Sequence, residues 1–176
     1  ELYNWSIKNP ENFWSDCWDY TQIVGSKGKE IITKNNVFYK NQFFKDSKLN
    51  FAENLLIKNT DDIAIHSLKE GGFKENITWK ELRENVFKIS YFLKKIGLRK
   101  NDRVAGYVPN TIETVISFLA SAKNGYIWSS CSPDFGVHGL VDRFKQIEPK
   151  VLFTCDYYYY NGKKIDILNR IPEILK

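Results

Sequence analysis

The chain has 176 residues, of which 43% are hydrophobic and 27% charged, so it can bury a core as one globular domain with or without an arm. Its net charge of +5 comes without a basic run interleaved with aromatic side chains, which argues against nucleic-acid binding and favours a solvated surface. No apolar run reaches the roughly 18 residues that span a bilayer and no leader opens the chain, so we expect no membrane segment.

Residues 1–58 are expected to form a helical or irregular arm. Asn9-Pro10-Glu11 is typical of a helix start, because asparagine caps helices, proline suits the first turn and an acid there faces the positive end of the dipole. A stripe then recurs at about one helical turn, formed by Phe13, Trp14, Cys17 and Trp18. Such a stripe is more often a packing surface against the main body than a ligand site. A brief helix over residues 51–57 should be capped by Asn50.

Residues 59–176 are expected to form the first part of a more regular α/β domain. Segments 63–68 and 73–77 are typical of two strands joined by a turn at Glu70-Gly71-Gly72. Thr78 with Glu81 three residues later predicts a capping box at the start of a long helix. That helix should end at Gly97 and turn one apolar face inward, formed by Leu82, Val86, Ile89, Leu93 and Ile96.

Three short apolar strands then alternate with two helices. The strands are expected over 104–108, 126–129 and 151–154, with helices from Asn110 or Thr111 to Gly125 and over 137–147. This alternation predicts parallel strands with right-handed crossovers and helices on the faces of the sheet. Ligands in such sheets bind beyond the carboxyl ends of the strands, so the loops that begin there are candidate sites.

Familiar catalytic signatures are missing from the sequence. Gly106 stands alone in its strand, without the glycine pattern of dinucleotide sites, and no Walker-type loop occurs. Asp134-Phe135-Gly136 matches a kinase triplet only by chance, since the other kinase segments are missing. The sequence contains no nucleophile elbow for which His66 or His138 could act as the base. Its three widely spaced cysteines favour a reducing cytoplasm over a disulfide framework or zinc site. No catalytic or metal-binding residue is therefore predicted within this chain.

Five segments resemble those of the adenylate-forming acyl-CoA synthetase superfamily, most closely its acetoacetyl-CoA synthetases. They are Leu49–Leu56, Ile77–Leu82, Asn101–Asn110, Ile127–Gly136 and Gln146–Lys150. The segment at 127–136 is the most specific of them, because acetyl-CoA synthetases have a glycine-rich version there. Asn101 departs from the pattern, since it stands where the family usually has glycine.

The resemblance implies an α/β fold with a mainly parallel sheet, flanking helices and an aromatic-rich helical arm before it. It also implies a ligase that uses ATP to turn acetoacetate into an acyl-adenylate, which the thiol of coenzyme A then attacks. The sites for ATP and Mg²⁺ would lie beyond Lys176, so the rest of the chain is a necessary partner and this piece alone should be inactive. The chain starts at Glu1 and contains no methionine, so an incomplete N-terminus is expected.

The resemblance further implies two segments that contact coenzyme A at its adenine end and 3′-phosphate. The first consists of Pro133, Asp134 and Phe135, where family members have paired glycines at the first two positions. The second consists of Tyr160, Asn161, Gly162 and Lys163, where Lys163 keeps a cation in place of arginine and Tyr160 loses one. An exposed turn without a ligand explains the second segment equally well.

Two alternatives to an acetoacetate ligase stay open on the sequence. The first is a ligase for acetate, propionate or another short acid, because later segments would complete the acid pocket. The second is a non-catalytic α/β module that binds a nucleotide or a partner. The coding DNA downstream of Lys176 would distinguish the module from a ligase. A Thr-Ser-Gly-Thr-Thr-Gly-like loop encoded there would support a ligase, and a stop codon would support the module.

Overall fold

The computed structural model describes residues 1–72 and 74–175 and divides the chain into two compact units, Glu1–Leu55 and Leu56–Lys176. The sequence places the arm boundary after residue 58, close to this division. Phe73, expected to start the second strand of a hairpin, lies outside the described residues.

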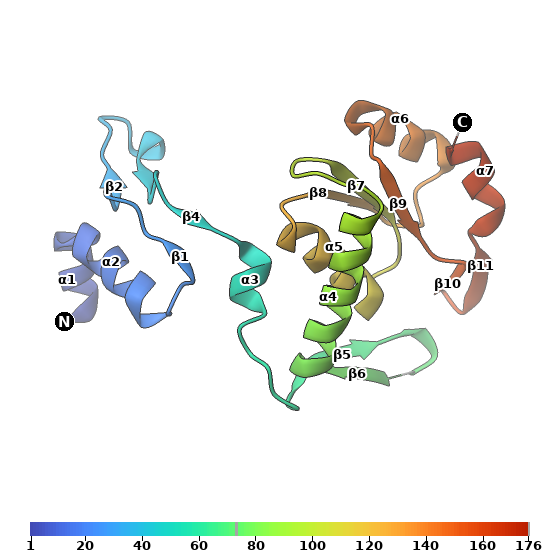
Figure 1. Ribbon diagram of the computed structural model, residues 1–176, viewed down its shortest axis with the longest axis horizontal. Helices are drawn as coiled ribbons and strands as arrows, with labels where there is room; N and C mark the ends of the chain where they lie inside the picture. Colours follow the sequence, from blue (N-terminus) through green and yellow to red (C-terminus); the bar gives the residue numbers. More distant parts are fainter. Residues whose placement is uncertain (73, 176) are drawn as a thin grey trace. The chain divides into compact units, whose positions relative to one another are not determined.

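The first unit joins three helices to two short antiparallel strand pairs (Figure 1). The helices are α1 (Leu2–Lys8), α2 (Pro10–Tyr20) and α3 (Phe51–Leu55), with a 3₁₀ turn, η1, at Phe38–Lys40. Strand β1 (Gly25–Ser26) pairs with β4 (Lys48–Leu49), and β2 (Ile32–Thr33) pairs with β3 (Gln42–Phe43). Helix α2 begins at Pro10 as expected, but the side chain of Asn9 does not cap it. The Asn9 side-chain amide instead donates to the carbonyl of Trp5 at 3.3 Å, which also accepts the Asn9 backbone N–H at 2.8 Å.

The aromatic stripe of α2 packs within its own unit. The ring centroid of Trp14 lies 5.6 Å from that of Phe43, and Trp18 lies 5.1 Å from Phe44. Phe13 makes edge contacts with Trp5 at 6.1 Å and with Trp14 at 5.3 Å. These contacts give the stripe a packing role, because edge and tilted arrangements are the favourable geometries for aromatic pairs.

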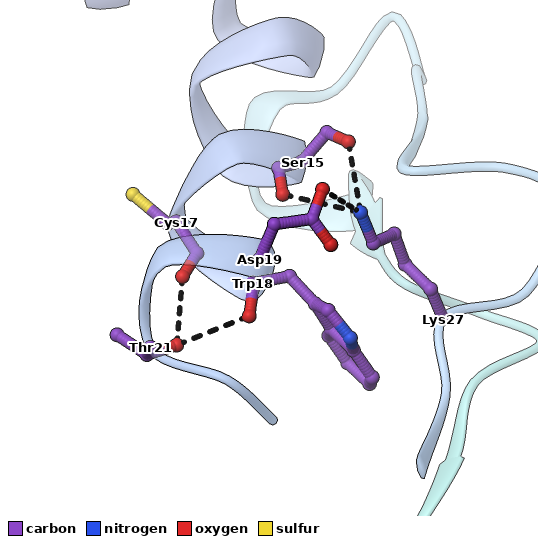
Figure 2. Close-up of polar contacts among 6 residues, drawn as sticks. All are labelled: Ser15, Cys17, Trp18, Asp19, Thr21 and Lys27. Carbon is purple, nitrogen blue, oxygen red and sulfur yellow. Dashed lines mark hydrogen bonds and ion pairs between the residues drawn. The ribbon is translucent and has the colours of Figure 1, made fainter. Parts of the chain in front are cut away.

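Polar contacts fasten the C-terminal half of α2 to the segment after β1 (Figure 2). The Lys27 ammonium donates to the Ser15 hydroxyl at 3.2 Å and to the Ser15 carbonyl at 3.3 Å, and it pairs with the Asp19 carboxylate at 2.6 Å. The Thr21 hydroxyl donates to the carbonyl of Cys17 at 2.7 Å, which also accepts the Thr21 backbone N–H at 3.0 Å, so Thr21 closes the last turn of the helix with two hydrogen bonds.

Two asparagines explain part of the family-like segment at 49–56 in physical terms. The Asn50 side chain accepts the Glu53 backbone N–H at 3.0 Å, which confirms the predicted cap of α3. The Asn54 side chain accepts the N–H of Val24 at 2.8 Å and donates to its carbonyl at 2.9 Å, in the way that a neighbouring strand would. This segment is therefore structural, because it ties α3 to the start of β1.

The second unit holds the rest of the fold (Figure 1). Its strands are β5 (Ile63–Leu68), β6 (Lys74–Thr78), β7 (Arg103–Tyr107), β8 (Ile127–Cys131), β9 (Val151–Thr154), β10 (Tyr157–Tyr160) and β11 (Lys163–Asp166). Its helices are α4 (Trp79–Lys95), α5 (Ile112–Lys123), α6 (Val137–Ile147) and α7 (Ile171–Ile174), with 3₁₀ turns η2 (Glu70–Gly72) and η3 (Leu168–Arg170).

Helix α4 starts at the predicted capping box. The Glu81 N–H donates to the Thr78 hydroxyl at 3.2 Å, and the Glu81 carboxylate accepts the Thr78 N–H at 2.9 Å. The predicted apolar face is confirmed at Leu82, Val86 and Leu93, which are buried, but Ile96 is 47% exposed because the helix ends at Lys95. Ser90 is buried instead, and its hydroxyl donates to the side chain of Asn124 at 2.8 Å. That polar link to the end of α5 has no local signal in the sequence.

The central sheet has the order β8-β7-β9, and both pairs are parallel as predicted. Ala105 and Tyr107 on β7 pack with Leu140 and Phe144 of α6, so this helix covers one face. The other face carries Trp128. Its ring centroid lies 6.4 Å from that of Phe118 on α5 and 5.9 Å from that of Phe153 on β9. The α/β fold with a parallel sheet and flanking helices is therefore confirmed. The second strand, expected over 126–129, is β8 at the edge of this sheet, where Ile127 is 50% exposed.

The segment before β7 aligns the strands by polar contacts. Asn101 has a φ of +70°, the left-handed region that favours glycine, which explains the residue usual at this position in the resembled family. Asp102 accepts the Arg99 N–H at 2.7 Å and pairs with Lys150 at 2.8 Å, and the Lys150 ammonium holds the pKa of this carboxyl below its ordinary value. Arg103 donates to the backbone carbonyls of Ile147 and Glu148 at the end of α6.

Candidate functional site

The carboxyl ends of the three parallel strands meet at one edge of the sheet, because Tyr107 stands opposite both Cys131 and Thr154. A cleft of about 1030 Å³ opens at this edge. Its walls come from both strands of the β5–β6 hairpin, the loop after β7, the first turns of α5, and segment 153–159. The position agrees with the rule that ligands of parallel sheets bind beyond the strand ends.

One wall of the cleft carries paired charges. The Lys69 ammonium lies 2.6 Å from the Glu75 carboxylate, and this contact raises the pKa of Lys69. Burial opposes the ionisation of Glu113, but hydrogen bonds from its own N–H and from the Thr111 hydroxyl outweigh it and lower the pKa of this carboxyl. Lys69 and Glu113 are therefore charged at neutral pH.

The first predicted coenzyme-binding segment forms a loop whose backbone is fixed from below. Pro133 is fully buried. The buried hydroxyl of Tyr107 lies 3.0 Å from both the Pro133 and the Phe135 carbonyl oxygens. The Arg170 guanidinium donates to the Tyr107 hydroxyl at 3.0 Å and to the Pro133 carbonyl at 3.1 Å. Because Pro133 is enclosed, its side chain supports the loop and does not offer a surface to a ligand.

Asp134 is held by side chains on either side of it. The Tyr158 hydroxyl donates to one carboxylate oxygen at 2.7 Å, and the Ser132 hydroxyl donates to the other at 2.9 Å. Burial, together with the hydrogen bond to Asp134, raises the pKa of Tyr158 to about 12, so the phenol stays protonated and donates at neutral pH. Both oxygens of Asp134 are thus engaged within the protein.

Phe135 is the member of this segment that offers an open surface. Its ring is 40% exposed, and the Arg143 guanidinium lies 4.8 Å from the ring centroid. An exposed aromatic ring beside a planar cation is able to stack on a flat heterocycle such as a nucleotide base.

The second predicted segment is the turn of a β-hairpin. Strands β10 and β11 are antiparallel, and Tyr160 pairs with Lys163 across the Asn161-Gly162 turn. Both turn residues have positive φ, 49° and 73°. The turn agrees with the sequence analysis, which did not, however, expect the strands β10 and β11 on either side of it. An Asn-Gly dipeptide between two runs of strand formers was the signal that could have predicted the hairpin.

The turn presents its polar groups at the surface. Tyr160 is 57% exposed, and Lys163 is also exposed, with no ion-pair partner in the described part of the chain. The backbone N–H groups of Asn161 and Gly162 donate to the two carboxylate oxygens of Glu70 at 3.0 Å each. The neighbouring Lys164 ammonium lies 3.8 Å from the centroid of the Tyr157 ring.

The two predicted segments lie at different ends of the β10–β11 hairpin. Tyr158, near its base, contacts Asp134, whereas the second segment begins two residues further on at Tyr160, about 7 Å along an extended strand. Among residues 1–72 and 74–175, no hydrogen bond or ion pair joins the two segments directly. Sequence reasoning missed the residues that hold them, which are Tyr107, Tyr158 and Arg170 for the loop and Glu70 for the turn, since each acts over a long sequence separation.

Across residues 1–72 and 74–175, no group of three or more histidine, cysteine, aspartate or glutamate side chains is arranged to hold a metal ion. No helix in the described part is long and apolar enough to cross a membrane.

The chain is similar to acetoacetyl-CoA synthetases over its whole length. It is 44% identical to the acetoacetyl-CoA synthetase of Xenopus tropicalis over 182 aligned residues, which cover 100% of this chain and 27% of that protein. A malonamoyl-CoA synthetase of Penicillium aethiopicum is 38% identical, with 99% of this chain and 25% of that protein covered. The solved acetoacetyl-CoA synthetase of Streptomyces lividans superposes with a TM-score of 0.87 at 34% identity, over 98% of this chain and 27% of that one.

The chain thus spans about a quarter of the length of these relatives. A family model described as "AMP-binding enzyme" matches residues 54–176, well over half of the chain. This range contains the parallel sheet, the cleft and both predicted coenzyme-binding segments. The chain therefore belongs to the family of AMP-binding enzymes.

Proposed function

We propose that this chain is the N-terminal portion of an ATP-dependent, AMP-forming ligase that joins acetoacetate to coenzyme A. The observation that carries the proposal is that the likeness to acetoacetyl-CoA synthetases extends through both units, in sequence and in fold. Residues 1–58 would form the N-terminal arm of such an enzyme, and residues 59–176 the first part of its AMP-binding domain. Its reducing, cytoplasmic setting is supported by three cysteines that are all free thiols.

The reaction would proceed in two displacements. The carboxylate of acetoacetate attacks the α-phosphorus of ATP and pyrophosphate leaves, and the thiol of coenzyme A then attacks the acyl carbon and AMP leaves. Mg²⁺ would neutralise charge on the phosphates, and we assign its site and that of ATP to the rest of the protein, where the resemblance places them. This chain alone would then be inactive and would need the remainder of its own protein as a partner.

We assign to this chain a share of the coenzyme A site. Lys163 would pair with the 3′-phosphate, since it is an exposed cation without an ion-pair partner in the described part of the chain. Tyr160 and the backbone of Asn161 and Gly162 would flank the same phosphate. Phe135 would stack on the adenine, and Pro133 and Asp134 would hold the loop that carries it.

The test is Lys163→Glu in the complete protein. A charge-assisted contact of about 1.5–3 kcal/mol corresponds to a rise of roughly tenfold to a hundredfold in the KM for coenzyme A. Pyrophosphate exchange driven by acetoacetate and ATP should stay unchanged, because it needs no coenzyme. Lys145→Glu makes the same charge change at an exposed position of α6 and is the matched control. Loss of exchange in Lys163→Glu would place this residue in the adenylation step or in the fold, and would refute the assignment.

A second candidate is a ligase for another short acid, such as acetate, propionate or an amide-bearing acid. The similarity to a malonamoyl-CoA synthetase supports it, because that protein's acid differs from acetoacetate only at its end. The complete protein should be assayed with a panel of these acids. The highest kcat/KM for acetoacetate would support the first candidate, and a higher value for another acid would replace it.

A further inference from the structure

The tips of the β5–β6 and β10–β11 hairpins lie side by side in the second unit (Figure 1). Glu70, in the first tip, reaches the turn in the second. One carboxylate oxygen accepts the N–H of Asn161 and the other accepts the N–H of Gly162, both at 3.0 Å. The contact joins residues 91 and 92 positions apart in the sequence.

The geometry of this contact is that of a filled anion site. Two successive residues with positive φ direct neighbouring N–H groups to one side of the turn, and such pairs of donors bind anions. A carboxylate presents two oxygens to the two donors in the same way as a phosphate does. The chain thus supplies its own anion to the turn beside Lys163.

The contact between Glu70 and the turn is also weak enough for another anion to replace the carboxylate. The side chain is exposed, so water and salt screen its charge and the contact contributes little to stability. In the described part of the chain, Glu70 has no ion-pair partner, whereas Lys69 beside it is committed to Glu75. A phosphate monoester carries more charge than a carboxylate and would add a pairing with the Lys163 ammonium.

We propose that Glu70 is an internal competitor for the phosphate of the ligand at the Asn161–Gly162 turn, so that the ligand must displace the Glu70 carboxylate to bind. The identity of the ligand as coenzyme A rests on the function proposed above. The apparent affinity is then reduced by the fraction of protein in which Glu70 occupies the turn.

Glu70→Gln in the complete protein tests this competition. Glutamine keeps the size of the side chain and one acceptor but lacks the charge, so the hairpin should fold while the competitor is weakened. The KM for coenzyme A should fall by roughly 1.5-fold to fivefold, the range expected for an exposed charge contact. Glu84→Gln, at an exposed position on α4, is the matched control and should leave this KM unchanged.

Direct binding separates the inference from the proposed function. Calorimetric titration of Glu70→Gln should show tighter binding of coenzyme A and an unchanged affinity for dephospho-coenzyme A, which lacks the 3′-phosphate. Weaker or unchanged binding of coenzyme A in this variant would overturn the competition, while a raised KM in Lys163→Glu would still uphold the site. An unchanged KM in Lys163→Glu would refute the site itself, whatever the result for Glu70→Gln.

Discussion

The two candidate segments differ in how the protein holds them. The loop around Pro133 has its carbonyl groups bound by the buried Tyr107 hydroxyl and by Arg170, and both oxygens of Asp134 are engaged. The Asn161-Gly162 turn is held at its N–H groups by one exposed carboxylate. Because buried hydrogen bonds are costly to break and exposed ones are readily exchanged with solvent, the loop should act as a fixed support and the turn as the part that responds to a ligand.

Tyr107→Phe should give the largest effect on stability. The substitution removes the donor to the Phe135 carbonyl, a partly buried contact, and also an acceptor of the Arg170 guanidinium, and the loss of these partners should cost about 1–3 kcal/mol. A urea titration of the variant and the wild type measures this loss as a difference in the free energy of unfolding. Tyr159→Phe, at an exposed position on β10, is the control and should change stability by less than about 0.5 kcal/mol. Equal effects for the two variants would show that the loop is not held as described.

Tyr158→Phe should have a smaller effect, with a signature in pH. At neutral pH it removes one hydrogen bond to a carboxylate, about 1.5 kcal/mol. The pKa of Tyr158 is raised in the fold to about 12 from an ordinary value of 10.0, so its contribution is complete below pH 10 and is lost as the pH rises toward 12. The wild type should therefore lose stability more steeply than the variant over this window. Parallel curves of unfolding free energy against pH would contradict the assignment.

Substitutions of Asn101, which precedes β7 and lies outside the candidate site, should have the smallest effect on stability. Asn101→Gly should keep or slightly raise the melting temperature, because glycine adopts a φ of +70° without steric cost. Asn101→Ala should destabilise the chain by about 1 kcal/mol. A thermal melt of the two variants against the wild type decides the order, and a more stable alanine variant would refute the steric explanation.

Sequence reasoning succeeded where the signal was local. The capping box at Thr78 and the strand–helix alternation after Asp102 are such signals, because spacing alone determines which face is buried. The predictions that Ile96 is buried and that Asn9 caps α2 were wrong. Both residues lie at helix ends, where a shift of one residue changes the environment of a side chain. The supports of the candidate site could not be predicted, since Arg170 meets Pro133 and Glu70 meets Asn161 only after the chain has folded.

The central claim is that the turn at Asn161–Gly162 binds the phosphate of coenzyme A while the loop at Pro133 supports it. A crystal structure of the complete protein with coenzyme A tests it most directly. The account predicts the 3′-phosphate within hydrogen-bonding distance of Lys163 and of the two turn N–H groups, with the Glu70 carboxylate displaced and the loop backbone unmoved. Coenzyme A bound elsewhere, with Glu70 still on the turn, would contradict it.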